Sequence, residues 1–323
     1  MIRGFTFERA LSWPFTAPHA ASFPWIFGAA YAVVFIAVFG FITMMGAGDF
    51  AEWINLVEAA EGATNPEDGM DAVLAGFGLL MPWIILSSIV SWVIWAMFET
   101  ASQRRYIRGE RFSLGFGADE LRMMVVGLLW SLLGLVIIGV PIFLTMGSTF
   151  IALFTDPAGF ESSASIEQVG LQVLGIFFVM LILLPVYTFF ATRLAPCFGL
   201  TVKEQRIRFF DAWNVSRGRF WPIFGAYAIL AVAGSIIGQV IVGIAQTIMM
   251  PSALRSVENI ESSEELRALI FSPAFLVPMS IYFFITLFIQ GVLQHAVGGP
   301  AAFAVRHDPR GGIEADAQIG AFD

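Results

Sequence analysis

The chain contains six long apolar stretches, and no Asp, Glu, Lys or Arg interrupts the interior of any of them. A helix needs about 20 apolar residues to cross about 30 Å of hydrocarbon, and a charge at its centre costs about 2.5–3.5 kcal/mol on insertion scales. The stretches cover residues 23–45, 72–98, 123–146, 168–190, 220–249 and 272–296. The sequence therefore predicts an all-α polytopic membrane protein, with a bundle of six transmembrane helices forming a single domain over residues 1–323.

The composition excludes most classes of soluble protein. Of the 323 residues, 58% are hydrophobic and 13% are charged, whereas about 25% of residues are charged in an ordinary soluble domain. A soluble globule of this size cannot bury so much apolar surface. A soluble enzyme, a nucleic-acid-binding domain and a disordered chain are therefore excluded, and the single cysteine, Cys197, excludes an intrachain disulfide.

Basic residues are segregated along the chain. The first, third and fifth connections between the predicted spans hold 2 of the 17 Lys and Arg residues, and the rest of the chain holds 15. Cytoplasmic loops of membrane proteins carry an excess of Lys and Arg. The pattern therefore predicts that both termini lie in the cytoplasm.

Two clusters of basic residues lie in the second and fourth connections, which this topology places in the cytoplasm. Near an anionic leaflet each basic residue contributes about 1 kcal/mol of attraction, and Arg can bind phosphate bidentately. Two interpretations remain open: the clusters only set the topology, or they form a collar that binds anionic phospholipid headgroups. The candidate lipid contacts are Arg104, Arg105, Arg108, Arg111, Lys203, Arg206, Arg208, Arg217 and Arg219.

The fifth predicted span carries small and polar residues at helical spacing. Gly234 and Gly238 are four residues apart, and Gln239 and Gln246 are seven apart and share a face. Small residues at this spacing allow close helix contact, and buried amides can bond across helices at about 0.6–2 kcal/mol each. We expect helix packing here; the alternative is a polar path for a substrate.

Short amphipathic helices are predicted beside the spans. Residues 50–57 place their apolar side chains on one helical face, which suits the membrane–water interface. Ser262 and Glu265 have the spacing of a capping box and predict a second short helix. A third helix is expected to begin near Thr201 and to end at Gly218.

Two segments of the chain resemble each other. Residues 23–29 read FPWIFGA and residues 220–226 read FWPIFGA, so five of seven positions match. Both predicted spans run in the same direction, unlike the inverted repeats common in secondary transporters. The similarity indicates either a repeated helical-hairpin unit or a chance likeness between Phe-rich spans.

No recognisable chemistry accompanies these features. His19, His295 and His307 lie far apart in the sequence and have no Cys or carboxylate at ligand spacing, so no metal site or other cofactor is predicted. We expect His295 to be a snorkelling or hydrogen-bonded interface residue rather than a proton relay. No nucleophile elbow, Walker loop or dinucleotide-binding motif occurs, and an enzyme is therefore not predicted.

One stretch of the chain resembles a known family. Residues 193–196 read RLAP, and residues 212–221 fit the pattern AWxxxRGxFW. This pattern resembles the multi-pass membrane domain associated with bacterial glycerophosphodiester phosphodiesterases and related membrane proteins. The resemblance implies a module of the bacterial inner (cytoplasmic) membrane. It implies no hydrolase activity, because no connection is long enough to hold the soluble phosphodiesterase barrel.

Together these features predict a non-enzymatic inner-membrane protein that binds lipid or a partner protein. Membrane lipids are the expected partners, a protein partner or a second copy is a further candidate, and no nucleic acid is expected. The alternative is a transporter or channel for a small or lipid-like solute. An ion-coupled carrier usually needs a buried ionisable residue, and the predicted spans contain none. Residues 306–323 are predicted to form a flexible tail.

Overall fold

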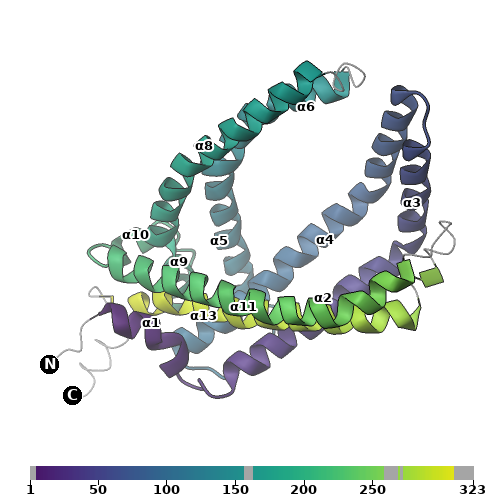
Figure 1. Ribbon diagram of the computed structural model, residues 1–323. Helices are drawn as coiled ribbons and strands as arrows, with labels where there is room; N and C mark the ends of the chain where they lie inside the picture. The colour runs from purple at the N-terminus through teal and green to yellow at the C-terminus, as the bar shows by residue number, and fades with distance from the viewer. Residues whose placement is uncertain (1–4, 156–162, 258–267, 270–271, 309–323) are drawn as a thin grey trace, which may run out of the picture. The chain divides into compact units, whose positions relative to one another are not determined.

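The computed structural model describes residues 5–155, 163–257, 268–269 and 272–308, and every regular element in these ranges is a helix (Figure 1). Six of the helices are long and apolar enough to cross a membrane, which confirms the predicted all-α, six-span fold. These candidate spans are Phe23–Met45, Asp68–Arg108, Ala118–Gly147, Gly170–Glu204, Phe220–Pro251 and Pro273–Arg306. The predicted capping box at Ser262 and Glu265 lies outside the described residues, as do residues 309–323 of the predicted tail.

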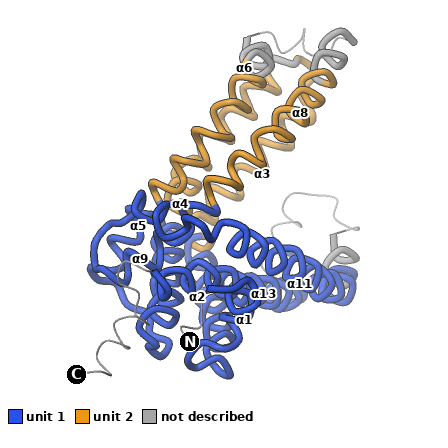
Figure 2. Tube along the Cα trace, turned by 90° about the vertical axis from the view of Figure 1, so that its left-hand side faces the viewer, with its two compact units in different colours: residues 1–42, 89–127, 192–323 blue, residues 43–88, 128–191 orange. Residues whose placement is uncertain are grey.

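The chain divides into two compact units (Figure 2). Unit 1 comprises residues 1–42, 89–127 and 192–323, and unit 2 comprises residues 43–88 and 128–191. Four helices contribute residues to both units: α2 (Phe23–Met45), α4 (Pro66–Arg108), α5 (Ala118–Gly134) and α8 (Ser163–Leu194).

Unit 1 is built on two long helices that lie side by side, α11 (Phe220–Val257) and α13 (Pro273–Arg306) (Figure 1). The short helix α1 (Phe7–Thr16) packs against both of them. Its N-cap is Thr6, whose hydroxyl accepts a hydrogen bond from the Arg9 backbone N–H and so satisfies one of the free donors of the first turn. The unit also contains most of α2 (Phe23–Met45), and the short helices α9 (Cys197–Glu204) and α10 (Ala212–Val215).

Two glycines bring α2 and α13 into close contact. A Cβ atom added to Gly291 would lie 3.2 Å from the Gly28 Cα atom, and one added to Gly28 would lie 2.9 Å from the Phe288 carbonyl oxygen. Only glycine allows the two backbones to approach so closely. The aromatic rings of Phe23, Phe27 and Phe98 pack beside this contact and form part of the buried core.

Unit 2 contains α3 (Ala47–Glu61), which packs against the first half of α4. The indole Nε1–H of Trp83 donates a hydrogen bond of 2.7 Å to the Asp49 carboxylate, and a Cβ on Gly76 would lie 3.0 Å from the Trp53 ring. The helix predicted over residues 50–57 is therefore confirmed, while its place at the membrane interface stays a prediction. The remaining helices of unit 2 expose apolar side chains, as expected of surfaces that face lipid.

A short π-helix, η1 (Leu135–Gly139), joins α5 to α6 (Val140–Thr155). The backbone N–H of Val140 bonds to the carbonyl of Leu135, five residues earlier. The next residue, Pro141, has no N–H to donate to the carbonyl four residues before it, and this loss accounts for the wider turn.

The helix predicted from Thr201 to Gly218 is wrong. Helix α9 ends at Glu204, and Gln205 adopts a left-handed conformation with φ of 54° that stops it. The chain then passes through residues 205–211 before α10 begins at Ala212. Gly218, with φ of 75°, ends the following turn before α11 begins.

Candidate functional site

Helix α4 continues past the apolar stretch from which its span was predicted. The prediction ended at Phe98, but the helix ends at Arg108, where Gly109 follows with φ of 68°. The added turns bury two ionisable side chains in unit 1, since Glu99 is 6% exposed and Arg105 is 0% exposed. The expectation that the spans hold no buried ionisable residue is therefore wrong.

The Arg105 guanidinium binds the end of α1 and the segment that connects α1 to α2. Its Nε donates to the Pro18 carbonyl at 2.8 Å, and its Nη2 donates to the carbonyls of Pro14 at 3.2 Å and Ala17 at 3.4 Å. Its Cζ atom lies 4.9 Å from the centre of the Phe23 ring, within reach of a cation–π interaction. Arg105 is thus enclosed by protein, and its predicted contact with a lipid headgroup is wrong.

His295 of α13 is the fourth partner of Arg105. Its Nε2 bonds to Arg105 Nη1, its Nδ1 lies 2.6 Å from Ser102 Oγ, and its ring stacks on Tyr106 at 4.6 Å. A guanidinium can only donate, so Nε2 is assigned as the acceptor and Nδ1 carries the proton. The hydrogen bonding predicted for His295 is confirmed, with both side-chain partners on α4. The side chain does not snorkel, because His295 is 1% exposed.

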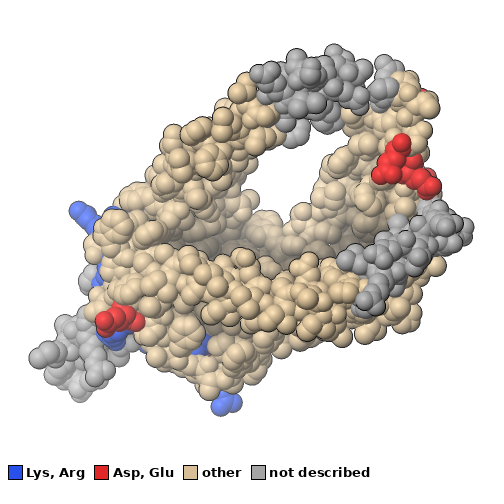
Figure 3. Space-filling model, in the orientation of Figure 1, with Lys and Arg blue, Asp and Glu red and all other residues tan. Residues whose placement is uncertain are grey.

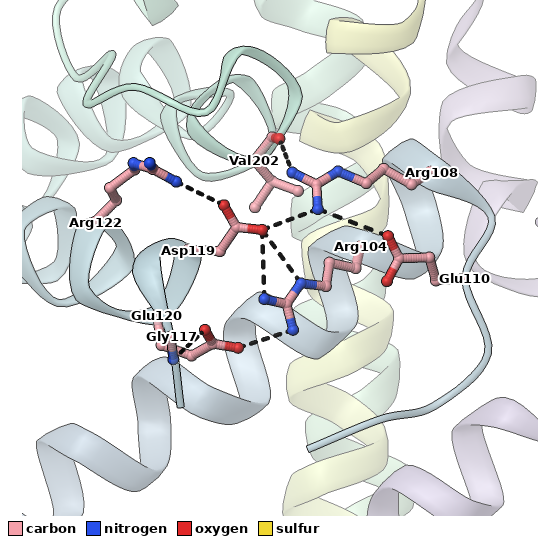
Figure 4. A network of polar contacts seen from close by, with 8 residues as sticks. All are labelled: Arg104, Arg108, Glu110, Gly117, Asp119, Glu120, Arg122 and Val202. Atoms are coloured by element: carbon pink, nitrogen blue, oxygen red, sulfur yellow. Dashed lines mark hydrogen bonds and ion pairs between the residues drawn. The ribbon is translucent and has the colours of Figure 1, made fainter. Parts of the chain in front are cut away.

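Asp119, in the first turn of α5, accepts hydrogen bonds from three arginines (Figure 4). Its carboxylate lies 3.3 Å from Arg104, 2.9 Å from Arg108 and 2.9 Å from Arg122. Arg108 also donates to the Val202 carbonyl of α9 at 2.6 Å. The network therefore joins the end of α4 to α5 and α9.

Two further carboxylates complete this network. Glu120, which is 1% exposed, pairs with Arg104 at 2.8 Å, and Glu110 pairs with Arg108 at 3.6 Å. Glu120 also accepts a hydrogen bond from the Gly117 backbone N–H, which caps the start of α5. The three guanidinium groups thus face three carboxylates, and this balance of charge indicates a structural role for Arg104 and Arg108.

Two more of the predicted lipid contacts have partners inside unit 1. Arg208 pairs with Glu204 and Asp211, each at 2.8 Å, and the hydrogen bond to Asp211 raises the pKa of its guanidinium. Arg219 donates to the carbonyls of Ala304 at 3.2 Å and His307 at 2.7 Å. Burial lowers the pKa of Arg219 from its usual value. Lys203 is half-buried on α9.

Three of the predicted lipid contacts remain at the surface. Arg111, Arg206 and Arg217 are exposed, and no ion pair or hydrogen bond holds their guanidinium groups within the described ranges. Large apolar side chains are exposed near them in the sequence, including Phe210 at 76% and Trp221 at 73%. In the view of Figure 3 most of the described surface carries no charge, and the visible Lys and Arg atoms lie on unit 1.

The small and polar residues of α11 lie on different faces. A Cβ on Gly234 would lie 2.5 Å from Leu293 Cδ2, and one on Gly238 would lie 3.2 Å from Ile289 Cγ2, so both glycines face α13. Gln239 and Gln246 are exposed and take no part in this contact. The structure therefore brings the glycines to a helix contact and leaves the glutamines outside it.

The described residues contain no group of three or more His, Cys, Asp or Glu side chains that could hold a metal ion. No protein-family model, curated protein or solved structure matches the chain. The resemblance of residues 193–221 to the membrane domain of glycerophosphodiester phosphodiesterases therefore stays a prediction.

Proposed function

We propose that the protein is a non-enzymatic module of the bacterial inner membrane that binds anionic phospholipid headgroups through Arg111, Arg206 and Arg217. The observation that supports this proposal is the difference between basic residues with partners inside the protein and basic residues without them. Most of the predicted contacts are held by carboxylates or backbone carbonyls of unit 1, whereas these three guanidinium groups face solvent. A free guanidinium offers paired N–H groups that match a phosphate, and exposed aromatic side chains favour the headgroup region.

Charge-preserving substitutions test this proposal. Replacing Arg111, Arg206 and Arg217 together with Lys keeps the positive charge and removes the planar fork. Exposed ion pairs contribute about 0.2–1 kcal/mol each, and three of them together about 0.6–3 kcal/mol. We therefore expect retention of phosphatidylglycerol or cardiolipin to weaken by roughly threefold or more. Native mass spectrometry of the full chain, released from detergent, measures that retention.

Arg208→Lys is the matched control, because Glu204 and Asp211 already engage its guanidinium. We expect this variant to retain anionic lipid as the wild type does. Equal retention by the wild type and the triple variant would leave the three arginines with a role in topology only.

We propose further that both termini face the cytoplasm, since the first, third and fifth connections between the predicted spans hold 2 of the 17 basic residues and the rest of the chain holds 15. Cysteines introduced at Glu61 and Gly115, both exposed, provide the test once the buried Cys197 is replaced by Ala. A membrane-impermeant thiol reagent should label position 61 from the periplasmic side and position 115 from the cytoplasmic side. Labelling of both positions from one side would contradict this topology.

An ion-coupled transporter is the second candidate function. The burial of Glu99 in unit 1 supports it, because ionisable side chains inside a membrane bundle commonly mark ion or proton pathways. The predicted spans contain no such residue, because Glu99 falls one position beyond the predicted end of its span. The charge and partners of Glu99 therefore bear on this candidate function.

A further inference from the structure

Glu99 has no basic partner in unit 1. Its carboxylate accepts a hydrogen bond of 2.8 Å from Gln103 Nε2, and Gln294 of α13 also faces it. No Lys, Arg or His in the described ranges forms an ion pair with it. A buried carboxylate with only neutral neighbours costs several kcal/mol, because protein dipoles replace its hydration incompletely.

The charged and titratable groups around Glu99 do not supply a positive charge to balance its carboxylate. Arg105 lies six residues further along α4, about 9 Å along the helix axis, and it is engaged by His295 and backbone carbonyls. The other titratable groups whose charge would interact with that of Glu99 are Tyr106 of α4, Cys197 of α9 and Tyr227 of α11. All three are neutral in their ordinary protonated forms.

Two buried oxygen atoms next to Glu99 also lack partners. Thr100 Oγ1 and Gln103 Oε1 have no hydrogen-bond partner among the described residues, and their residues are 0% and 1% exposed. Gln103 lies one helical turn from Glu99 and is bonded to it, while Thr100 is the next residue along α4. An unpaired buried oxygen costs about 1–3 kcal/mol, and such groups in native proteins commonly serve an ion or a water molecule.

Two glycines close this part of the bundle. A Cβ on Gly298 of α13 would lie 3.1 Å from Gln103 Nε2 and 3.8 Å from Glu99 Oε1, and one on Gly199 of α9 would lie 3.1 Å from Gln103 Oε1. The absence of side chains at these positions lets three helices meet around the polar groups of α4. The Gln103 amide therefore lies between the backbones of α9 and α13, beside Glu99.

We propose that Glu99 and the neighbouring oxygens of Thr100 and Gln103 bind a single monovalent cation, either a proton on the carboxylate or a sodium ion shared among the oxygens. One positive charge offsets the one unpaired negative charge. Carboxylate, hydroxyl and amide oxygens are the ligands that a hard cation prefers. This inference stands apart from lipid binding at Arg111, Arg206 and Arg217, and failure of either test leaves the other proposal unaffected.

The first measurement titrates sodium against the thermal stability of the wild-type chain in detergent, with choline chloride keeping the ionic strength constant. If sodium is the ligand, Tm should rise saturably, by roughly 5–10 °C at a sodium concentration 100 times its dissociation constant. Glu99→Gln should abolish the rise, while Glu8→Gln, which changes an exposed carboxylate of α1, should preserve it.

The second measurement identifies a bound proton in the same preparations. If a proton is the ligand, the infrared spectrum of the wild type at neutral pH should contain the carbonyl band of a protonated carboxylic acid. That band should be missing in Glu99→Gln and present in Glu8→Gln, and sodium should not change Tm. Glu99→Gln should then be more stable than the wild type at alkaline pH, because the amide stays neutral.

Two wild-type results together would overturn the proposal, whether or not the Glu99→Gln variant folds. They are the absence of a carboxylic acid band at neutral pH and a Tm that does not respond to sodium. Glu99 would then be a permanent anion solvated by amides and water. Gly298→Ala adds an independent check, because its methyl group should displace the Gln103 amide and weaken the cation response.

Discussion

Replacing Arg105 with Ala should lower the free energy of unfolding by about 3–5 kcal/mol, the cost of breaking a buried charged hydrogen-bond network by removing one partner. The substitution leaves three backbone carbonyls without their donor, one in the last turn of α1 and two between α1 and α2, and it leaves the Nε2 atom of His295 without its donor as well. It also opens a cavity beside the Phe23 ring. Thermal or denaturant unfolding of the purified protein in detergent measures the loss.

Arg111→Ala is the control for this experiment. Arg111 is exposed, and the substitution should change stability by no more than about 0.5 kcal/mol, as surface substitutions usually do. Arg105→Lys should rescue only part of the loss, because an ammonium group cannot reach acceptors arranged around a planar fork. A loss for Arg105→Ala as small as that for Arg111→Ala would show that the guanidinium does not hold the connection between α1 and α2.

The predicted lipid contact of Arg105 is wrong because hydropathy places the end of the span too early. Hydropathy ends a span where polar residues begin, although the backbone hydrogen bonds of a helix continue regardless of side-chain polarity. Positions 99, 102, 103 and 106 follow helical spacing and are buried on α4. That burial is visible only in the structure, because Glu99, Ser102 and Gln103 are polar and form no apolar period. The basic residues that precede Gly109 are a helix stop signal, and this signal could have extended the helix to Arg108 from the sequence alone.

The partners of these residues could not be predicted in the same way. Arg105 and His295 are 190 residues apart, and nothing in the local sequence of either residue indicates the other. The sequence thus locates the clusters of basic residues. The three-dimensional contacts decide which of these residues bind partners inside the protein. Local sequence does not distinguish these arginines from one another. Carboxylates bind Arg104 and Arg108, whereas Arg111 and Arg206 are exposed.

The resemblance between residues 23–29 and 220–226 has a limited counterpart in the structure. Both segments open a long helix, and an arginine stacks on the first aromatic ring of each: Arg105 on Phe23 and Arg193 on Phe220. The matching glycines differ in their neighbours, because Gly28 faces α13 while Gly225 faces Phe7 of α1. Similar local sequence therefore sets similar helix starts, and the packing around each helix is decided elsewhere.

A substitution at the close contact between α2 and α13 should also cause a large loss of stability. In Gly28→Leu the new Cβ would lie 2.7 Å from Val292 Cγ2 and 2.9 Å from the Phe288 carbonyl oxygen. The backbone oxygen cannot move aside as the end of a side chain can, so the two helices must separate. We expect a loss of about 3 kcal/mol, at the upper end of the usual cost of overpacking, measured as a lower Tm in detergent.

Gly40 on the same helix gives a matched control, because no atom lies within 4 Å of a Cβ placed there. Gly40→Leu should leave the stability unchanged or raise it slightly, since leucine favours the helix more than glycine does. Equal losses in the two variants would point to a general effect of leucine on α2 and would contradict a specific contact with α13. A loss confined to Gly28→Leu would show that the backbone contact itself holds the two helices together.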